Sequence, residues 1–236
     1  MGELPLTVVC KQSSLAEARG RITTTHDGIG DFKVLPVWHP RSVVADTTQE
    51  PVLFSDLRKA NRQRAFPEVR RPQRWLHLRP SIDDLEDFWN EFIEPATHLS
   101  IDIETKGRVI TCLGVAPSPE RALVIPFYTE EHRDGNYWRT ATEERQAWEY
   151  VRRLCSTPGK NVFGHNFSYD AQYIWREMGL PIPQWTDDTM LMHHAMQPEM
   201  RKGLGFLASL YSDELAWKKL VKHRKASDRG GKKEDD

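Results

Sequence analysis

Apolar and polar residues alternate in the stretch His98-Leu99-Ser100-Ile101-Asp102-Ile103-Glu104-Thr105. This alternation predicts a β-strand, in which side chains two residues apart lie on the same face. Asp102 and Glu104 are therefore expected side by side, with isoleucines anchoring the opposite face. Two neighbouring carboxylates repel unless a cation or a proton lies between them, and Mg²⁺ prefers oxygen ligands of this kind. The alternative interpretation is an edge strand with a solvated acidic face.

Two further polar blocks follow at a distance. The first reads Asn161-Val162-Phe163-Gly164-His165-Asn166-Phe167-Ser168-Tyr169-Asp170, which is typical of a short strand that ends at Gly164 and runs into a helix from about Ser168. Asp170 is then expected in the first turn of that helix. The second block reads Trp185-Thr186-Asp187-Asp188-Thr189-Met190-Leu191-Met192-His193-His194. We expect Asp188 to cap a helix or to support the site from behind, in preference to binding a metal.

Together these blocks resemble the 3′→5′ exonuclease domain of family-A DNA polymerases, within the DEDD (DnaQ-like, ribonuclease-H-like) exonuclease superfamily. Asp102-Ile103-Glu104-Thr105 looks like the first family motif, and Asn166-Phe167-Ser168-Tyr169-Asp170 looks like the second. Asp188-Thr189-Met190-Leu191, with the later stretch Gly203 to Tyr211, is similar to the approach to the third motif. The resemblance covers about residues 81–220.

The resemblance implies an α/β fold of the ribonuclease-H-like type, with a mixed sheet flanked by helices, and hydrolysis of phosphodiesters at DNA 3′ ends in replication and proofreading. It also implies two Mg²⁺ or Mn²⁺ ions, since two ions about 3.5–4 Å apart can activate water and stabilise the leaving oxygen. By position in the motifs, Asp102 would bridge both ions. Glu104 would bind the ion that activates water, and Asp170 would bind the other.

Three residues beside these carboxylates are expected to contact the substrate, a single-stranded DNA 3′ end. Asn166 would contact the terminal nucleotide, and Thr105 offers a backbone N–H and a hydroxyl at the strand end. Phe167 is a candidate for stacking on a base, because stacking tolerates any sequence. The alternative for Phe167 is a core aromatic.

The sequence departs from the family at its fourth carboxylate, which is expected in a Tyr-x-x-x-Asp element. No such spacing follows Asp188. His223 and Asp228 match the His-x-x-x-x-Asp form of the histidine-type branch, but they lie in residues 218–236, a charged tail that is typical of disorder. We therefore expect a polymerase domain or a separate polypeptide to complete the site. The alternatives are a nucleic-acid-binding module without turnover and an RNA-processing exonuclease of the ribonuclease D type.

Residues 1–66 carry a different pattern. The stretch Leu35-Pro36-Val37-Trp38-His39-Pro40, together with the turn Arg19-Gly20 and a helix expected over 54–64, resembles the C-terminal part of uracil-DNA glycosylase-superfamily domains. That resemblance would place His39 over a flipped uracil, and the alternative is a loop or capping histidine. The water-activating half of the glycosylase fold has no counterpart here, so this region is interpreted as a small α/β remnant.

The remaining boundaries follow from composition and periodicity. Residues 67–80 contain three prolines and four arginines, which predicts an extended basic linker. The exonuclease-like domain is expected over 81–217, beginning at a capping box formed by Ser81 and Asp84. Its expected elements are strands over 98–104, 109–115, 122–127 and 161–163, and helices from 81 and over 141–154, 168–178, 188–196 and 204–211.

Composition narrows the function classes. The 236 residues carry a net charge of -1, yet residues 58–79 hold eight basic residues against the single acid Glu68. Such a run either attracts phosphates or forms a solvated face. The three cysteines are far apart and lack metal-ligand spacing, which argues against zinc, iron–sulfur and disulfide frameworks. No apolar run of membrane-spanning length is present, so the expected location is the cytoplasm. The pairing of a glycosylase-like remnant with an exonuclease-like domain resembles phage polymerase modules, which implies a bacterium or a phage-infected cell.

Overall fold

The computed structural model describes residues 3–70, 72–179 and 186–214. The chain divides into two compact units, of which the first joins Met1–Arg71 to Gln197–Asp236 and the second comprises Pro72–Met196. The first unit is therefore discontinuous in sequence, because its second piece follows the whole of the other unit. Across the described residues, no helix has the length and apolar character needed to cross a bilayer.

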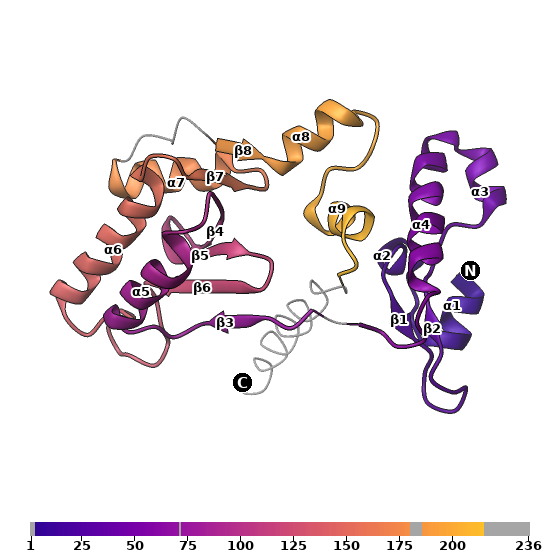
Figure 1. The fold of residues 1–236 in the computed structure, drawn as a ribbon, viewed down its shortest axis with the longest axis horizontal. Helices are drawn as coiled ribbons and strands as arrows, with labels where there is room; N and C mark the ends of the chain where they lie inside the picture. Colours follow the sequence, from indigo (N-terminus) through magenta and orange to yellow (C-terminus); the bar gives the residue numbers. More distant parts are fainter. Residues whose placement is uncertain (1–2, 71, 180–185, 215–236) are drawn as a thin grey trace, which may run out of the picture. The chain divides into compact units, whose positions relative to one another are not determined.

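A mixed six-stranded sheet forms the centre of the second unit (Figure 1), with the strand order β3-β6-β5-β4-β7-β8. β4, β5 and β6 form an antiparallel meander, because their connections are too short for a crossover. β7 runs parallel to β4, and β8 runs parallel to β7. The strands are β3 (Trp75–His77), β4 (His98–Lys106), β5 (Val109–Ser118), β6 (Arg121–Pro126), β7 (Asn161–Gly164) and β8 (Thr186–Asp188).

Helices cover one face of this sheet and bury its apolar side chains. The helices of the unit are α5 (Ile82–Phe88), α6 (Ala141–Ser156), α7 (Ser168–Met178) and α8 (Thr189–Met196), and a π-helical turn over Trp89–Ile93 follows α5. α5, α6 and α7 pack on the face that carries Leu99, Ile101 and Ile103 of β4 in a single core. A mixed sheet with helices on it confirms the predicted ribonuclease-H-like layout.

Local sequence signals explain where these helices begin and end. Ser81 and Asp84 form the expected capping box: the Ser81 side chain accepts from the Asp84 N–H, and the Asp84 carboxylate accepts from the Ser81 N–H at 2.8 Å. Thr140 and Glu143 form a second one at the start of α6. α7 ends at Gly179, which adopts φ +63°, a conformation that glycine reaches without steric cost.

The structure corrects several expected elements. Trp75–His77 lies in the stretch expected to be a linker, yet it pairs with β6 as an edge strand, a position where flanking prolines are tolerated. β8 was not expected, because three residues carry no periodicity. The helix expected from residue 54 begins at Glu50, where Pro51 occupies the favoured first turn. Phe32 to Pro40 has the apolar character of a strand that runs into a loop, yet only Lys33–Val34 forms a strand there.

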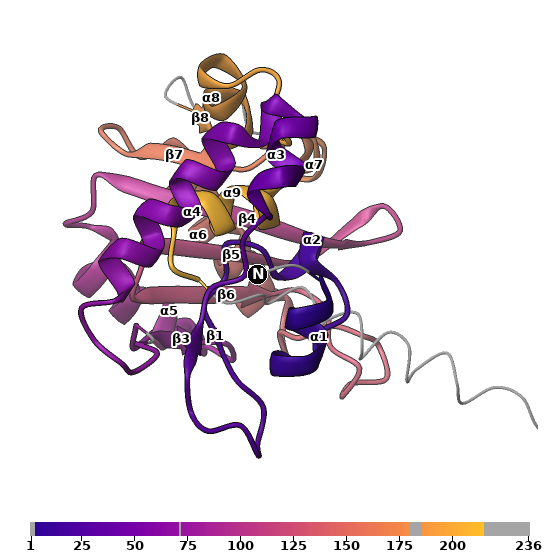
Figure 2. The same ribbon diagram turned by 90° about the vertical axis from the view of Figure 1, so that its right-hand side faces the viewer.

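The first unit consists of short helices around one long one. Its elements are α1 (Glu3–Cys10), α2 (Leu15–Ala18), β1 (Thr23–Thr24), β2 (Lys33–Val34), α3 (Pro40–Ala45), α4 (Glu50–Gln63) and α9 (Leu204–Tyr211), with a 3-10 turn over Thr47–Gln49. The loop between β1 and β2 extends away from α3 and α4 (Figure 2). α9 falls within the stretch expected to form the exonuclease-like domain, and its contacts group it with the N-terminal residues of the first unit.

A buried cluster of charged side chains joins α9 to the N-terminal residues. Arg19 donates to Asp56 of α4 at 2.7 Å and also to the Ser209 hydroxyl of α9. Lys59 donates to the carbonyls of Gly20, Ser209 and Ser212, at 2.8, 2.6 and 2.6 Å. The Lys59 ammonium thus caps the last carbonyls of α9, where a positive charge is favourable. Burial of such charges is stable only when each has partners.

Replacing Lys59 by methionine will destabilise the first unit by about 3 kcal/mol or more, because two buried carbonyls and one half-buried carbonyl lose their donor. Urea denaturation followed by circular dichroism measures this change. Arg62→Met is the matched control on the same helix, since the Arg62 side chain is exposed, and its effect will stay within about 0.5 kcal/mol. Equal effects of the two substitutions would contradict the role given to Lys59.

Candidate active site

The two carboxylates of β4 lie on the face of the sheet opposite the helix-covered core. Asp102 and Glu104 are exposed, whereas Ile101 and Ile103 are buried, as the alternation predicted. Glu104 pairs in register with Cys112 of β5. Burial is the main cause that raises the pKa of the Cys112 thiol, and the negative charges of Glu104 and Asp102 add to it. A β-bulge follows Glu104 and turns the end of the strand.

Asp170 brings the second motif to this strand. Its carboxylate accepts a hydrogen bond from the Ile103 N–H at 2.9 Å, at the residue between Asp102 and Glu104. The residue is only 4% exposed. Burial raises the pKa of Asp170 to about 6, the Ile103 N–H opposes this rise, and the negative charge of Asp102 adds to it. The fold thus holds the Asp170 carboxylate in a place where its charged form is disfavoured by burial and by the nearby charge of Asp102.

Asp188 has a different role from the other acids. Its carboxylate accepts from the N–H groups of Met190 and Leu191 in α8 and from those of Asn166 and Phe167 in the turn before α7. Burial pushes its pKa upward, but these backbone donors outweigh that effect and leave the pKa below its usual value. Asp188 therefore caps α8 and fixes the turn that leads to Asp170, which is the supporting role expected from the sequence.

The turn held by Asp188 exposes Asn166 to solvent and buries Phe167. Asn166 is exposed and adopts φ +59°, a left-handed conformation that asparagine tolerates better than most residues. Phe167 is 3% exposed and belongs to the hydrophobic core. The proposed stacking role of Phe167 is therefore corrected to the alternative of a core aromatic: its ring fills the space that glycine leaves at position 164.

Thr105 and Tyr169 are joined next to the acids. Their hydroxyl groups lie 2.9 Å apart, so one donates to the other across β4 and α7. Tyr169 is 44% exposed, which leaves its ring open to a ligand. Tyr169 belongs to the second motif, but the motif alone does not give this residue a role. The helical spacing of Tyr169, Tyr173 and Arg176, which puts them on one face of α7, is the feature of the sequence that could have pointed to it.

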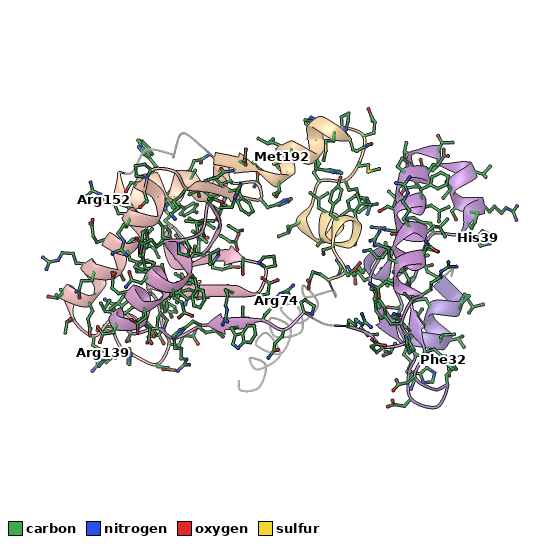
Figure 3. The ribbon with its side chains drawn as sticks, viewed as in Figure 1. Phe32, His39, Arg74, Arg139, Arg152 and Met192 are labelled. Atoms are coloured by element: carbon green, nitrogen blue, oxygen red, sulfur yellow. The ribbon has the colours of Figure 1, made fainter. Side chains whose placement is uncertain are left out.

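The other expected site residues lie elsewhere. His39 is in the first unit, beside α3 (Figure 3), and its Nδ1 accepts from the Arg41 N–H at 3.1 Å, which makes it the N-cap of that helix. This is the capping role that the sequence left open as an alternative to uracil binding. His223 and Asp228 lie outside the described residues.

The site offers carboxylate oxygens, and the negative charges of these neighbouring carboxylates repel one another. Both properties favour binding of a divalent cation. A cation between Asp102 and Asp170 would relieve the charge that raises the pKa of Asp170. Within the part of the chain that the structure describes, however, no three His, Cys, Asp or Glu side chains are close enough together to hold an ion as they stand. The donor chemistry thus fits a cation, and a third ligand would require movement of a side chain.

Asp170→Asn will stabilise the protein at pH 7.5 in EDTA, by about 1–3 kcal/mol. The folded-state pKa is raised, so proton binding stabilises the wild-type fold below about pH 4, and this contribution is lost as the pH rises through 6. Asparagine keeps an oxygen for the Ile103 N–H but carries no charge. Thermal denaturation of both proteins between pH 4 and 8 checks this, with the difference vanishing at pH 4. A constant difference would contradict the assignment.

Asp188→Ala will destabilise the second unit by about 2–4 kcal/mol, since backbone N–H groups at the start of α8 and in the turn before α7 lose their acceptor. The neighbouring Asp187, whose exposed carboxylate accepts a hydrogen bond from the Asn161 side chain at 2.8 Å, provides the control. Asp187→Ala is expected to cost less than about 1 kcal/mol. Chemical denaturation of both variants gives the comparison, and a smaller loss for Asp188→Ala than for Asp187→Ala would refute it.

The sequence model of the 3′-5′ exonuclease family matches residues 81–232, which is more than half of the chain and includes all three carboxylates. No curated protein matches the chain by sequence.

Several solved structures are similar in fold. Escherichia coli RNase D, described as an exoribonuclease involved in structured RNA processing, is 16% identical over 60% of this chain and 34% of its own, with a TM-score of 0.44. The GMP complex of Trypanosoma brucei RNase D is 12% identical over 66% and 47%, with a TM-score of 0.49. Brucella melitensis NrnC with bound Mg²⁺ is 16% identical over 61% and 64%, with a TM-score of 0.41.

In each of these alignments the chain spans less than two thirds of the other protein's length. The family match, in contrast, runs through β4, α7 and the turn held by Asp188, the elements that build the acidic site. The chain therefore belongs to the 3′-5′ exonuclease family, of the DEDD type found in family-A DNA polymerases.

Proposed function

We propose that this chain removes nucleotides from single-stranded DNA 3′ ends, in the proofreading manner of replicative polymerases. The single observation that carries the proposal is the hydrogen bond from the Ile103 N–H to the Asp170 carboxylate. It places the acid of the second motif against the strand that carries Asp102 and Glu104. Acids gathered in this way can hold the divalent ions that a metal-dependent phosphodiesterase uses.

Asp102, Glu104 and Asp170 would hold Mg²⁺ or Mn²⁺, with two ions as the family-derived expectation. The bound ions supply an activated water and stabilise the charge on the leaving oxygen. Glu104 lies beside the bulge that ends β4, where Thr111 donates to its carbonyl at 2.9 Å and fixes the backbone. The Ile103 N–H donates a hydrogen bond to the Asp170 carboxylate, so the carboxylate would keep its position as charge develops during the reaction.

Thr105 and Asn166 orient the terminal nucleotide in this proposal. The Tyr169 hydroxyl fixes the Thr105 side chain, and the Asp188 carboxylate fixes the backbone N–H of Asn166 at 3.0 Å. Both groups therefore meet the substrate with little loss of conformational freedom. A polymerase domain or a separate polypeptide is the proposed partner, because it would supply the fourth carboxylate.

The proposal is tested by digestion of a 5′-labelled single-stranded DNA oligonucleotide with Mg²⁺ or Mn²⁺. Stepwise shortening from the 3′ end, abolished by EDTA, is expected. Asp102→Ala will lower the rate by at least about 100-fold, because the site loses a metal ligand. Asp87→Ala, which removes an exposed acid from α5, is the matched control and will leave the rate unchanged.

An RNA oligonucleotide of the same sequence decides the substrate class. A kcat/KM at least tenfold higher for DNA supports the proofreading assignment, whereas the reverse preference supports the ribonuclease D type of activity. If neither strand is shortened with either ion, the catalytic proposal fails. The remaining interpretation would then be a module that binds nucleic acid without turnover.

A further inference from the structure

A stripe of aromatic and cationic side chains runs along α7 from the acidic site. Tyr169, Tyr173 and Arg176 are spaced by four and three residues, so they lie on one helix face. The two tyrosine rings have centroids 4.9 Å apart, and the Arg176 guanidinium carbon lies 4.3 Å from the Tyr173 ring centroid. Each member therefore contacts the next, which makes the stripe continuous.

Both ends of this stripe are tied to β4 and its hairpin. At one end the Tyr169 hydroxyl is 2.9 Å from that of Thr105, which directly follows Glu104. At the other end Arg176 donates to the carbonyl of Arg108, in the turn between β4 and β5. The stripe thus begins beside the expected position of the 3′ nucleotide and leads away from it along a fixed path.

Further charges surround this path. Lys106, at the end of β4, donates to the Tyr128 hydroxyl at 2.9 Å and lies 4.3 Å from the centroid of that ring. Arg108 is exposed in the same hairpin. Glu177 lies 3.2 Å from Arg176 and offsets part of its charge. The hairpin therefore offers cations beside the aromatic rings, an arrangement found in surfaces that bind single strands.

We propose that Tyr173 and Arg176, continuing from Tyr169, bind the nucleotides that precede the 3′-terminal one in a single strand. Bases stack on the tyrosine rings, and the phosphates meet Arg176 and Lys106. From residue 169 to residue 176 the helix rises about 10 Å, at 1.5 Å per residue. This length is several times the ~3.4 Å spacing along one strand of a duplex, so the stripe extends past the terminal nucleotide. The inference rests on the proposed function and adds residues outside the three motifs.

Two consequences follow for substrate choice. Stacking accepts every base, so the stripe confers affinity without sequence preference. A dinucleotide places one base past the terminal position and so reaches at most Tyr173, whereas an oligonucleotide of eight residues covers the whole path. The contribution of the stripe should therefore grow with substrate length and be smallest for the shortest substrates.

The test is the binding of 5′-fluorescein-labelled two- and eight-residue thymidine oligonucleotides, measured by anisotropy in EDTA so that no cleavage occurs. Tyr173→Leu keeps an apolar side chain against the core but removes the ring, and Arg176→Gln removes the charge. Each is expected to weaken binding of the eight-residue strand by about tenfold and that of the dinucleotide by less than about threefold. Tyr173→Phe will restore the wild-type affinity, because the stacking ring is retained.

Trp175→Ala is the matched control, since Trp175 is 62% exposed on another face of α7. Its affinity for both strands will equal that of the wild type. The inference is overturned if Tyr173→Leu and Arg176→Gln bind the eight-residue strand as the wild type does, or if both lengths are weakened equally. In that case wild-type digestion of DNA would leave the proposed function standing. A wild type that neither binds nor degrades DNA would overturn both.

Discussion

The hydrogen bond from the Ile103 N–H to the Asp170 carboxylate is the interaction on which the acidic site depends. The bond uses the Ile103 N–H of β4 as its donor, and this contact fixes the start of α7 at one position along β4. The same contact keeps an acid buried close to Asp102, and the pKa of Asp170 rises as a result. The fold tolerates this unfavourable charge because the hydrophobic core beneath α7 and β4 holds both elements in place.

Asp188 shows how the same residue type serves the opposite purpose. Its oxygens are satisfied by backbone N–H groups from α8 and from the turn at Asn166, so its negative charge is stabilised where that of Asp170 is not. One acid therefore stabilises the fold, and the other is left in need of a positive charge. Environment, and not residue type, separates a structural carboxylate from a metal-ligand candidate.

The N-terminal residues acquire a structural meaning from the buried cluster of Arg19, Asp56, Lys59 and Ser209. These side chains tie α4 and the turn at Gly20 to α9, a helix inside the region matched by the exonuclease family. Gly20 adopts φ +70°, and a Cβ there would approach the Asp56 carboxylate to 2.8 Å. The cluster thus leaves no room for a side chain and makes the first unit from two distant pieces of sequence.

The sequence by itself determined the meander, the capped start of α5 at Ser81 and the placement of Asp102 and Glu104. Those features follow from alternation, capping residues and short connections, all of which act between neighbours in the chain. The short edge strands β3 and β8 escaped prediction, because three residues gain their hydrogen bonds only from a partner strand. Likewise only the tertiary structure decided that Phe167 is buried while Tyr169 is exposed. It also decided that α9 packs with the first 70 residues, since these choices depend on contacts between segments far apart in sequence.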